Sequence, residues 1–236
     1  MTVTSSAELT ARYHELLARV RGAGNAQLMA VSKGASAEQV ATVIDAGCTL
    51  FGENRVQELE AKRAAVAALR PAARVTWVLI GPLQSNKVRR AVELADRIAT
   101  VGSVDLLERI AARASERGRP IEIALQVNVD DDPAKSGFSA AGLREALPTI
   151  AAIVGRSHLR LAGLFTVGRL TAGGEAARPT FAQFRAIASH LESDASAIGL
   201  DLGPLRSAGM SGDFEVAISE GANEVRIGSA LFGPRG

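Results

Sequence analysis

The sequence predicts an α/β protein whose strands close into a (β/α)8 TIM barrel with one extra N-terminal helix. Apolar runs of strand length alternate with helical patterns along the whole chain, which indicates parallel strands joined by crossover helices. No linker or low-complexity stretch divides the sequence, so a single domain spanning residues 1–236 is expected. No Gly-x-Gly-x-x-Gly segment follows the first strand, which disfavours an open dinucleotide-binding sheet.

The predicted helices are marked by apolar spacing and by capping residues. Leu9, Tyr13 and Val20 recur at helical spacing in the first one, and two glycines end it. Ser36 and Ser103 precede later helices as N-caps. The helices are expected at residues 5–22, 36–46, 53–69, 87–94, 103–117, 138–153 and 179–198.

The predicted strands are short apolar runs between those helices. A glycine-rich loop separates the sixth strand from the last long helix. The strands are expected at residues 27–32, 48–51, 74–80, 97–101, 121–127, 159–164, 202–206 and 224–227. In a closed barrel of this kind the active face lies at the C-terminal ends of the strands.

Composition excludes several classes of function. The 27 basic and 25 acidic residues give a net charge of only +2, without a basic stripe, which argues against nucleic-acid binding. Cys48 is the single cysteine, and the three histidines show no ligand spacing, so neither a disulfide nor a metal site is expected. No apolar run approaches about 18 residues, and the N-terminus lacks a signal-peptide pattern. A soluble cytoplasmic protein without membrane or nucleic-acid partners is therefore expected.

The C-terminal segment carries two strand-to-turn-to-helix transitions, at residues 202–211 and 224–229. Small residues occupy both turns: Ser207, Ser211, Gly228 and Ser229. Unpaired amides at the start of a helix bind anions, phosphate above all. Two such turns at the end of a barrel are typical of the phosphate site formed by the loops after strands 7 and 8. The alternative is that they are ordinary tight turns with capping serines.

Two cations lie at the ends of the first and last strands. Lys33 is either a solvated surface charge or an amine that condenses with an aldehyde. Arg226 is either half of a salt bridge inside the barrel or a permanent cation directed at a ligand. An amine, a cation and a phosphate cradle are together what pyridoxal 5′-phosphate requires.

Five segments resemble the pyridoxal phosphate homeostasis protein family and occur in the order found there. They are AVSKG (30–34), FGENRVQE (51–58), IGPLQSNKV (80–88), VNVDDDPAKSGF (127–138) and the C-terminal stretch 207–233. The resemblance implies a fold similar to the N-terminal barrel domain of alanine racemase. It also implies that pyridoxal 5′-phosphate is bound as an aldimine on a lysine.

The resemblance further assigns individual residues. It implies that Lys33 is the aldimine lysine, that Arg226 is the partner of the pyridine nitrogen and that Asn54 lies beside the ring. It also implies a set of residues that hold the phosphate, namely Ser207, Ser211, Gly228 and Ser229.

These residues favour a carrier over a catalyst. Arginine cannot take up a proton from the pyridine nitrogen, so the ring is expected to stabilise a carbanion poorly. Tyr13, the single tyrosine, is interpreted as a packing residue, which leaves no second base for racemisation. We expect a monomeric protein of vitamin B6 homeostasis that buffers the cofactor and passes it to apo-enzymes. An amino-acid racemase is the first alternative, and a lysine-dependent aldolase without cofactor is the second.

Five positions, in four segments, depart from the pattern expected of the family. Gly34 follows the lysine where a larger residue is usual, and Val78 stands where a His-Phe pair begins. Phe165-Thr166 replaces a Met-Ala pair, and Gly168 replaces a proline. None of these changes removes a group that binds the aldehyde or the phosphate, but they affect the size of the pocket and its contacts with the ring.

Overall fold

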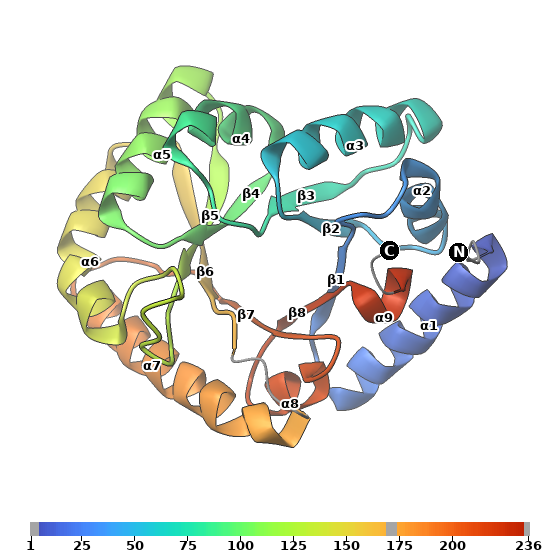
Figure 1. Cartoon of the computed structure of the whole chain (residues 1–236). Coiled ribbons are helices and arrows are strands. Elements are labelled where there is room, and N and C mark those ends of the chain that lie inside the picture. The colour runs from blue at the N-terminus through green and yellow to red at the C-terminus, as the bar shows by residue number, and fades with distance from the viewer. Residues whose placement is uncertain (1–4, 169–173, 234–236) are drawn as a thin grey trace.

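The computed structural model describes residues 5–168 and 174–233, and within them eight parallel strands form a closed barrel in chain order. Figure 1 looks along this barrel, with β8 beside β1 and the helices arranged outside. The predicted fold class is confirmed. The strands are β1 (Gln27–Val31), β2 (Leu50–Glu53), β3 (Thr76–Leu79), β4 (Arg97–Val101), β5 (Ile121–Gln126), β6 (Leu159–Phe165), β7 (Leu205–Met210) and β8 (Glu224–Ile227).

The helices connect successive strands on the outside of the barrel, and α1 is the extra N-terminal one (Figure 1). Residues 169–173, which belong to the predicted glycine-rich loop, lie outside the described residues. The long helices are α1 (Ser6–Ala23), α2 (Ala37–Asp45), α3 (Val56–Leu69), α4 (Val88–Leu94), α5 (Val104–Arg117), α6 (Ala140–Gly155) and α7 (Arg178–Ala197). The short ones are η1 (Ser85–Lys87), η2 (Gly174–Ala177), α8 (Phe214–Ser219) and α9 (Ser229–Phe232).

Serine caps fix where several helices begin. In α1 the Ser5 side chain accepts a hydrogen bond from the Glu8 amide, and the Glu8 side chain accepts one from the Ser5 amide. Ser36 and Gln39 form the same reciprocal capping box at α2, and Ser103 caps α5. Each cap satisfies amides that a helix start leaves unpaired, so the capping serines predicted from the sequence are confirmed.

The hydrophobic core consists of two apolar layers. One is the large core between the outer faces of the strands and the helices, and the other is a smaller cluster inside the ring of strands. Successive side chains on a strand point to opposite faces, which produces this division. The inner cluster consists of Met29, Leu50, Val78, Ala99, Ala124 and Phe165. Because these side chains fill the interior, the open part of the barrel is its rim.

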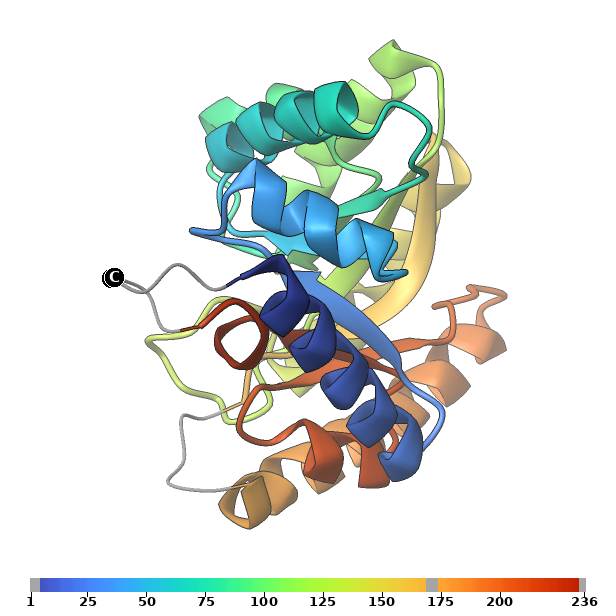
Figure 2. The ribbon, with the colours of Figure 1, turned by 90° about the vertical axis from the view of Figure 1, so that its right-hand side faces the viewer.

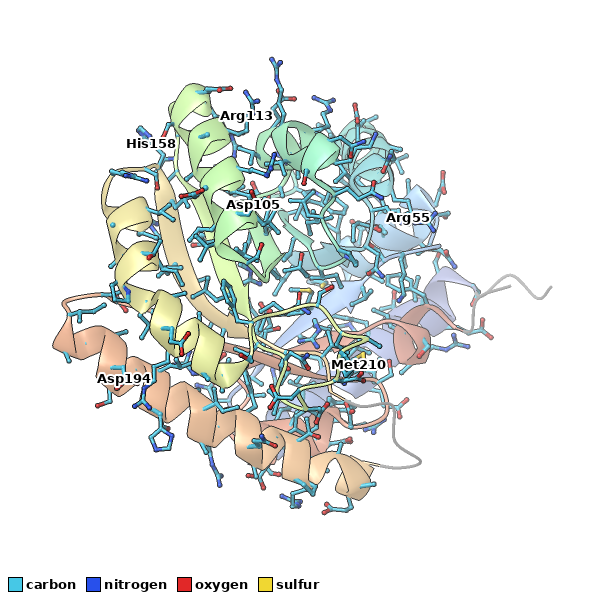
Figure 3. The ribbon with its side chains drawn as sticks, turned by 60° about the vertical axis from the view of Figure 1, so that its left-hand side comes forward. Arg55, Asp105, Arg113, His158, Asp194 and Met210 are labelled. Carbon is cyan, nitrogen blue, oxygen red and sulfur yellow. The ribbon has the colours of Figure 1, made fainter. Side chains whose placement is uncertain are left out.

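The strands have a common polarity, which separates the two ends of the molecule. Figure 3 shows His158, which precedes β6, on the opposite side of the molecule from Met210, which ends β7. Among the described residues no helix is both long and apolar enough to cross a membrane.

Three predicted boundaries are wrong. The seventh strand covers Leu205–Met210 rather than 202–206, so the small residues assigned to a turn belong to the strand. Residues before it turn instead: Gly203 has a φ of +76° and its amide donates to Asp201. The second strand extends to Glu53, and α3 begins only at Val56 rather than at 53. A small residue within a strand often marks a position where another backbone approaches closely.

We expect Gly163→Ala to disrupt the contact between β6 and β7. Gly163 has a φ of +145°, and an added Cβ would lie 2.2 Å from the carbonyl oxygen of Leu205. Backbone atoms cannot yield easily, so a loss of at least about 3 kcal/mol in the free energy of unfolding is expected. Gly22→Ala is the control, because no atom lies within 4 Å of its added Cβ, and its effect should stay within about 1 kcal/mol. Equal stability of both variants in chemical denaturation would contradict this account.

Candidate cofactor-binding site

The C-terminal ends of the strands meet at one rim, where most of the predicted site residues lie together. Lys33 follows β1, Asn54 follows β2 and Ser211 follows β7. Gly228 and Ser229 follow β8, which pairs with β1 and so closes the ring beside Lys33. In the side view of Figure 2 the loop after β5 lies at this rim. The fold therefore gathers the predicted amine, amide and turn residues at the active face.

Lys33 extends the inner face of β1. It is two residues beyond Val31 and four beyond Met29, whose side chain belongs to the inner cluster, and alternation gives all three the same side. Lys33 is half-buried, and its ammonium group makes no hydrogen bond or ion pair with the described residues. Gly34 has a φ of +77°, which explains the glycine at this position, since larger residues rarely adopt that conformation. The amine is thus left available to a ligand.

Arg226 lies inside the barrel on β8 and is only 4% exposed. One terminal nitrogen donates to the hydroxyl of Ser207 at 2.9 Å, and the other donates to the carbonyl oxygen of Thr166 at 2.7 Å. The ring of Phe165 lies 4.3 Å from its guanidinium carbon, in cation–π contact. Burial lowers the pKa of Arg226 to about 10, although Glu224 and Asp213 oppose the shift, so the group remains a cation at neutral pH.

The salt bridge weighed for Arg226 is not formed with any described residue. Glu224, two positions earlier on the same strand, pairs with Arg97 instead. A guanidinium has five N–H groups, and the hydrogen bonds to Ser207 and Thr166 use two of them, so three, including Nε–H, have no acceptor within the described part of the chain. A buried cation with a spare donor fits a ligand nitrogen or oxygen.

Ser207 has a different place from the predicted one. It lies within β7, is fully buried, and its hydroxyl accepts the hydrogen bond from Arg226. Its predicted placement in a turn is therefore wrong, while its assignment to the phosphate stays a prediction. Its role in orienting Arg226 was missed because the strand boundary was placed too early.

The turns after β7 and β8 present free amides. Those of Ser211, Gly212, Gly228 and Ser229 have no acceptor among the described residues. The hydroxyl of Ser211 accepts from the Ala230 amide at 3.3 Å, which joins the two turns. Several unpaired N–H groups in adjacent turns make a concave site for an anion. Ser211, Gly228 and Ser229 are thus brought together, as the sequence predicts.

Asn54 continues the inner face of β2 and is half-buried, and its side-chain amide has no partner in the described ranges. Gly81 passes so close that an added Cβ would lie 2.0 Å from the Asn54 carbonyl oxygen. Glycine at 81 therefore allows the loop after β3 to reach the rim beside Asn54.

The loop after β5 is fastened to its neighbours by ionic and polar contacts. Lys135 donates to the Asp130 carboxylate at 2.8 Å and to the carbonyl oxygen of Val167 at 3.3 Å. Thr180 donates to the other oxygen of Asp130 at 2.9 Å. The Asp130 side chain is only 6% exposed and is paired with Lys135, so this part of the acidic run 130–132 is not solvated. No group of three or more metal-ligating side chains occurs in the described part of the chain.

Tyr13 is 4% exposed in the outer core, on a helix outside the ring of strands. Burial raises its pKa to about 12, and the neighbouring Cys48 adds to the shift. Neither its place nor its acidity suits a general base at the rim, so its interpretation as a packing residue is confirmed.

The departures at 78, 165 and 166 have structural explanations. Val78 and Phe165 belong to the inner cluster beneath the rim. Phe165 covers one face of the Arg226 guanidinium, and Thr166 donates through its hydroxyl to the carbonyl oxygen of Val127. Val78, Phe165 and Thr166 thus shape the floor of the site. An added Cβ at Gly168 would meet Phe181 at 3.5 Å, an ordinary contact, so nothing in the structure explains the glycine there.

The chain matches known proteins over nearly its whole length. The family model described as alanine racemase, N-terminal domain, matches residues 5–236. The pyridoxal phosphate homeostasis protein of Pseudomonas aeruginosa is 40% identical over 94% of this chain and 93% of its own, and that of Escherichia coli K12 is 34% identical over 88% and 85%. The structure of PipY of Synechococcus elongatus with PLP bound has a TM-score of 0.84 and 36% identity, covering 95% of this chain and all of that one.

The closed barrel of parallel strands is the fold of the alanine racemase N-terminal domain. An alanine racemase of Clostridium difficile shares the fold at a TM-score of 0.73 and 14% identity, and this chain covers 57% of it. The chain belongs to the pyridoxal phosphate homeostasis protein family.

The shifted pKa of Tyr13 predicts a measurable alkaline transition. Its value of about 12 in the folded protein lies above the value of about 10 in the unfolded chain, so its contribution to stability is complete below pH 10 and lost as the pH rises through 12. Because the chain has one tyrosine, the near-ultraviolet absorbance of tyrosinate reports this group alone. Titration near pH 10 in the folded protein would contradict its burial, and Tyr13→Phe should remove the signal.

Phe165→Leu should lower stability more than Phe181→Leu. Both rings are buried, at 1% and 2% exposure, but only Phe165 contacts a guanidinium. The cation–π contact is expected to add about 0.5–2 kcal/mol to the loss in the free energy of unfolding. Denaturant titration of the two variants measures the difference, and an equal loss would show that the Arg226 contact contributes nothing.

Proposed function

We propose that this protein binds pyridoxal 5′-phosphate at the barrel rim through Lys33 and serves vitamin B6 homeostasis as a carrier. The observation that carries the proposal is the position of an unpaired amine, a buried cation and unpaired amides on one rim. Support also comes from relatives named pyridoxal phosphate homeostasis proteins and from PipY, whose structure is titled as having PLP bound.

Lys33 would hold the cofactor by condensation. Its Nζ would hold the aldehyde group of the cofactor through a carbon–nitrogen double bond, and the aldehyde oxygen would be released as water. Addition of water would reverse this and free the cofactor, so the bond would be exchangeable. Because Lys33 makes no ion pair with a described residue, no carboxylate there has to be displaced for this reaction.

The other residues would place the ring and the phosphate. The free amides of Ser211, Gly228 and Ser229 fit the phosphate, and Asn54 lies at the rim for a contact with the ring. The spare N–H of Arg226 would donate to the pyridine nitrogen and keep it unprotonated. An unprotonated ring withdraws electrons weakly, so carbanion chemistry is disfavoured.

The position of the single tyrosine supports a carrier role. Tyr13 is remote and has a raised pKa, which removes it as the second base of a racemase. The protein would act as a monomer in the cytoplasm, buffering a reactive aldehyde and passing it to apo-enzymes that require it.

The direct test is the visible absorption of purified protein incubated with pyridoxal 5′-phosphate. The wild type should show the band of an internal aldimine, and Lys33→Ala should lose it. Lys87→Ala is the matched control, because Lys87 is also half-buried but lies in η1 rather than on the inner face of a strand. A colourless wild type would contradict the proposal and favour the aldolase alternative.

A second test separates carrier from racemase. Loaded protein incubated with L-amino acids in deuterium oxide should give neither D-isomers nor deuterium at Cα, because Tyr13 is buried in the outer core and cannot act as a second base. It should, however, restore activity to an apo-enzyme that requires the cofactor. Exchange of the Cα hydrogen for deuterium over many turnovers per protein, with formation of the D-isomer, would establish the racemase alternative.

A further inference from the structure

We propose that the buried ion pair between Glu53 and Lys62 is a positioning device for Lys33. The proposal rests on the proposed function in that Lys33 is the residue that receives the cofactor. Glu53 directly precedes Asn54 in the chain, but the side-chain hydrogen bonds of Glu53 and Lys62 join them to Ser32 and to each other, not to the residues assigned to the ring or the phosphate.

The ion pair lies directly behind the end of β1. Glu53, the last residue of β2, is fully buried, and Lys62 of α3 has a side chain only 9% exposed. One carboxylate oxygen of Glu53 accepts from Lys62 at 2.8 Å and from the hydroxyl of Ser32 at 2.6 Å. Lys62 also donates to the carbonyl oxygen of Ser32, the residue immediately before Lys33. The pair therefore holds both the side chain and the backbone of Ser32.

Every polar group of Ser32 is engaged. In addition to the contacts with the ion pair, its amide donates to the Gly52 carbonyl oxygen at 3.0 Å, and its carbonyl oxygen accepts from the Ala35 amide at 2.9 Å. On the other side of Lys33, Gly34 adopts a φ of +77°. Lys33 is thus held between a fully bound residue and a sharp turn, which fixes the direction in which its side chain leaves the backbone.

A buried ion pair contributes little net free energy to the stability of a fold. Burying two charges removes them from water, and apolar residues of similar volume often serve stability as well or better. The second carboxylate oxygen of Glu53 is buried and has no partner among the described residues, which adds to the cost. What apolar residues could not supply is the hold on Ser32. The structure therefore assigns the pair to positioning rather than to stability.

Positioning matters because the reacting atom of Lys33 is at the end of a long side chain. A misplacement of about 1 Å in a reacting group can lower the rate of a reaction about 10²-fold. Loss of the hold on Ser32 should therefore weaken cofactor binding by at least about tenfold, even where the protein stays folded.

The test replaces the pair by apolar residues in Glu53→Leu/Lys62→Met. We expect the variant to fold with a moderately lowered midpoint of chemical unfolding, because no charge is left unpaired and only the Ser32 hydroxyl loses its acceptor. We also expect at least about tenfold weaker binding of pyridoxal 5′-phosphate. Asp45→Asn/Arg70→Gln is the control, since this pair joins the ends of α2 and α3 away from the rim; it should bind as tightly as the wild type. Wild-type affinity in the folded apolar variant would overturn the proposal.

A cofactor-free measurement separates this proposal from the proposed function. Amide hydrogen exchange of the segment 30–36 should be faster in the apolar variant than in the wild type, whether or not the protein binds pyridoxal 5′-phosphate. Unchanged exchange would overturn the positioning role, whereas a wild type that binds no cofactor would overturn only the proposed function. If the apolar variant does not fold, Ser32→Ala replaces it. That variant keeps the ion pair but loses the hydroxyl contact, and unchanged exchange and affinity in it would equally contradict the proposal.

Discussion

A guanidinium buried inside a parallel barrel must find acceptors, because an unpaired buried charge is costly. Arg226 finds them in the Ser207 hydroxyl on β7 and in the Thr166 carbonyl oxygen beyond β6, with the Phe165 ring against its face. These contacts join three neighbouring strands just below the rim. They also leave an N–H group free, so the same cation that holds the strands together can serve a ligand. The rest of the site is arranged around that fixed charge.

Charge is distributed unequally between the two ends of the barrel. Arg97 and Glu224 pair near the N-terminal ends of their strands, and Glu53 and Lys62 pair behind the rim. At the rim itself Lys33 and the amides of two turns have no partner among the described residues. These unpaired donors at the rim give a surface suited to an anionic aldehyde.

Much of the fold could be predicted from local patterns, and much of the site from its place in that fold. Alternating periodicity predicted the barrel, and residues at strand ends, such as Lys33 and Gly228, predicted the rim. Ser207 was misplaced because small residues are typical of turns, yet here they allow close packing within β7. The contacts of Glu53 with Lys62 and Ser32 were not predicted, because they join residues distant in sequence and depend on how α3 packs against the ends of two strands.

The central claim is that Lys33, and no other lysine, carries the cofactor. The measurement that tests it most directly is reduction of the loaded protein with borohydride, followed by peptide mapping by mass spectrometry. The account predicts one pyridoxyl group per chain, attached to the peptide that contains Lys33. Attachment at Lys62, Lys87 or Lys135 in place of Lys33, or no attachment at all, would contradict it.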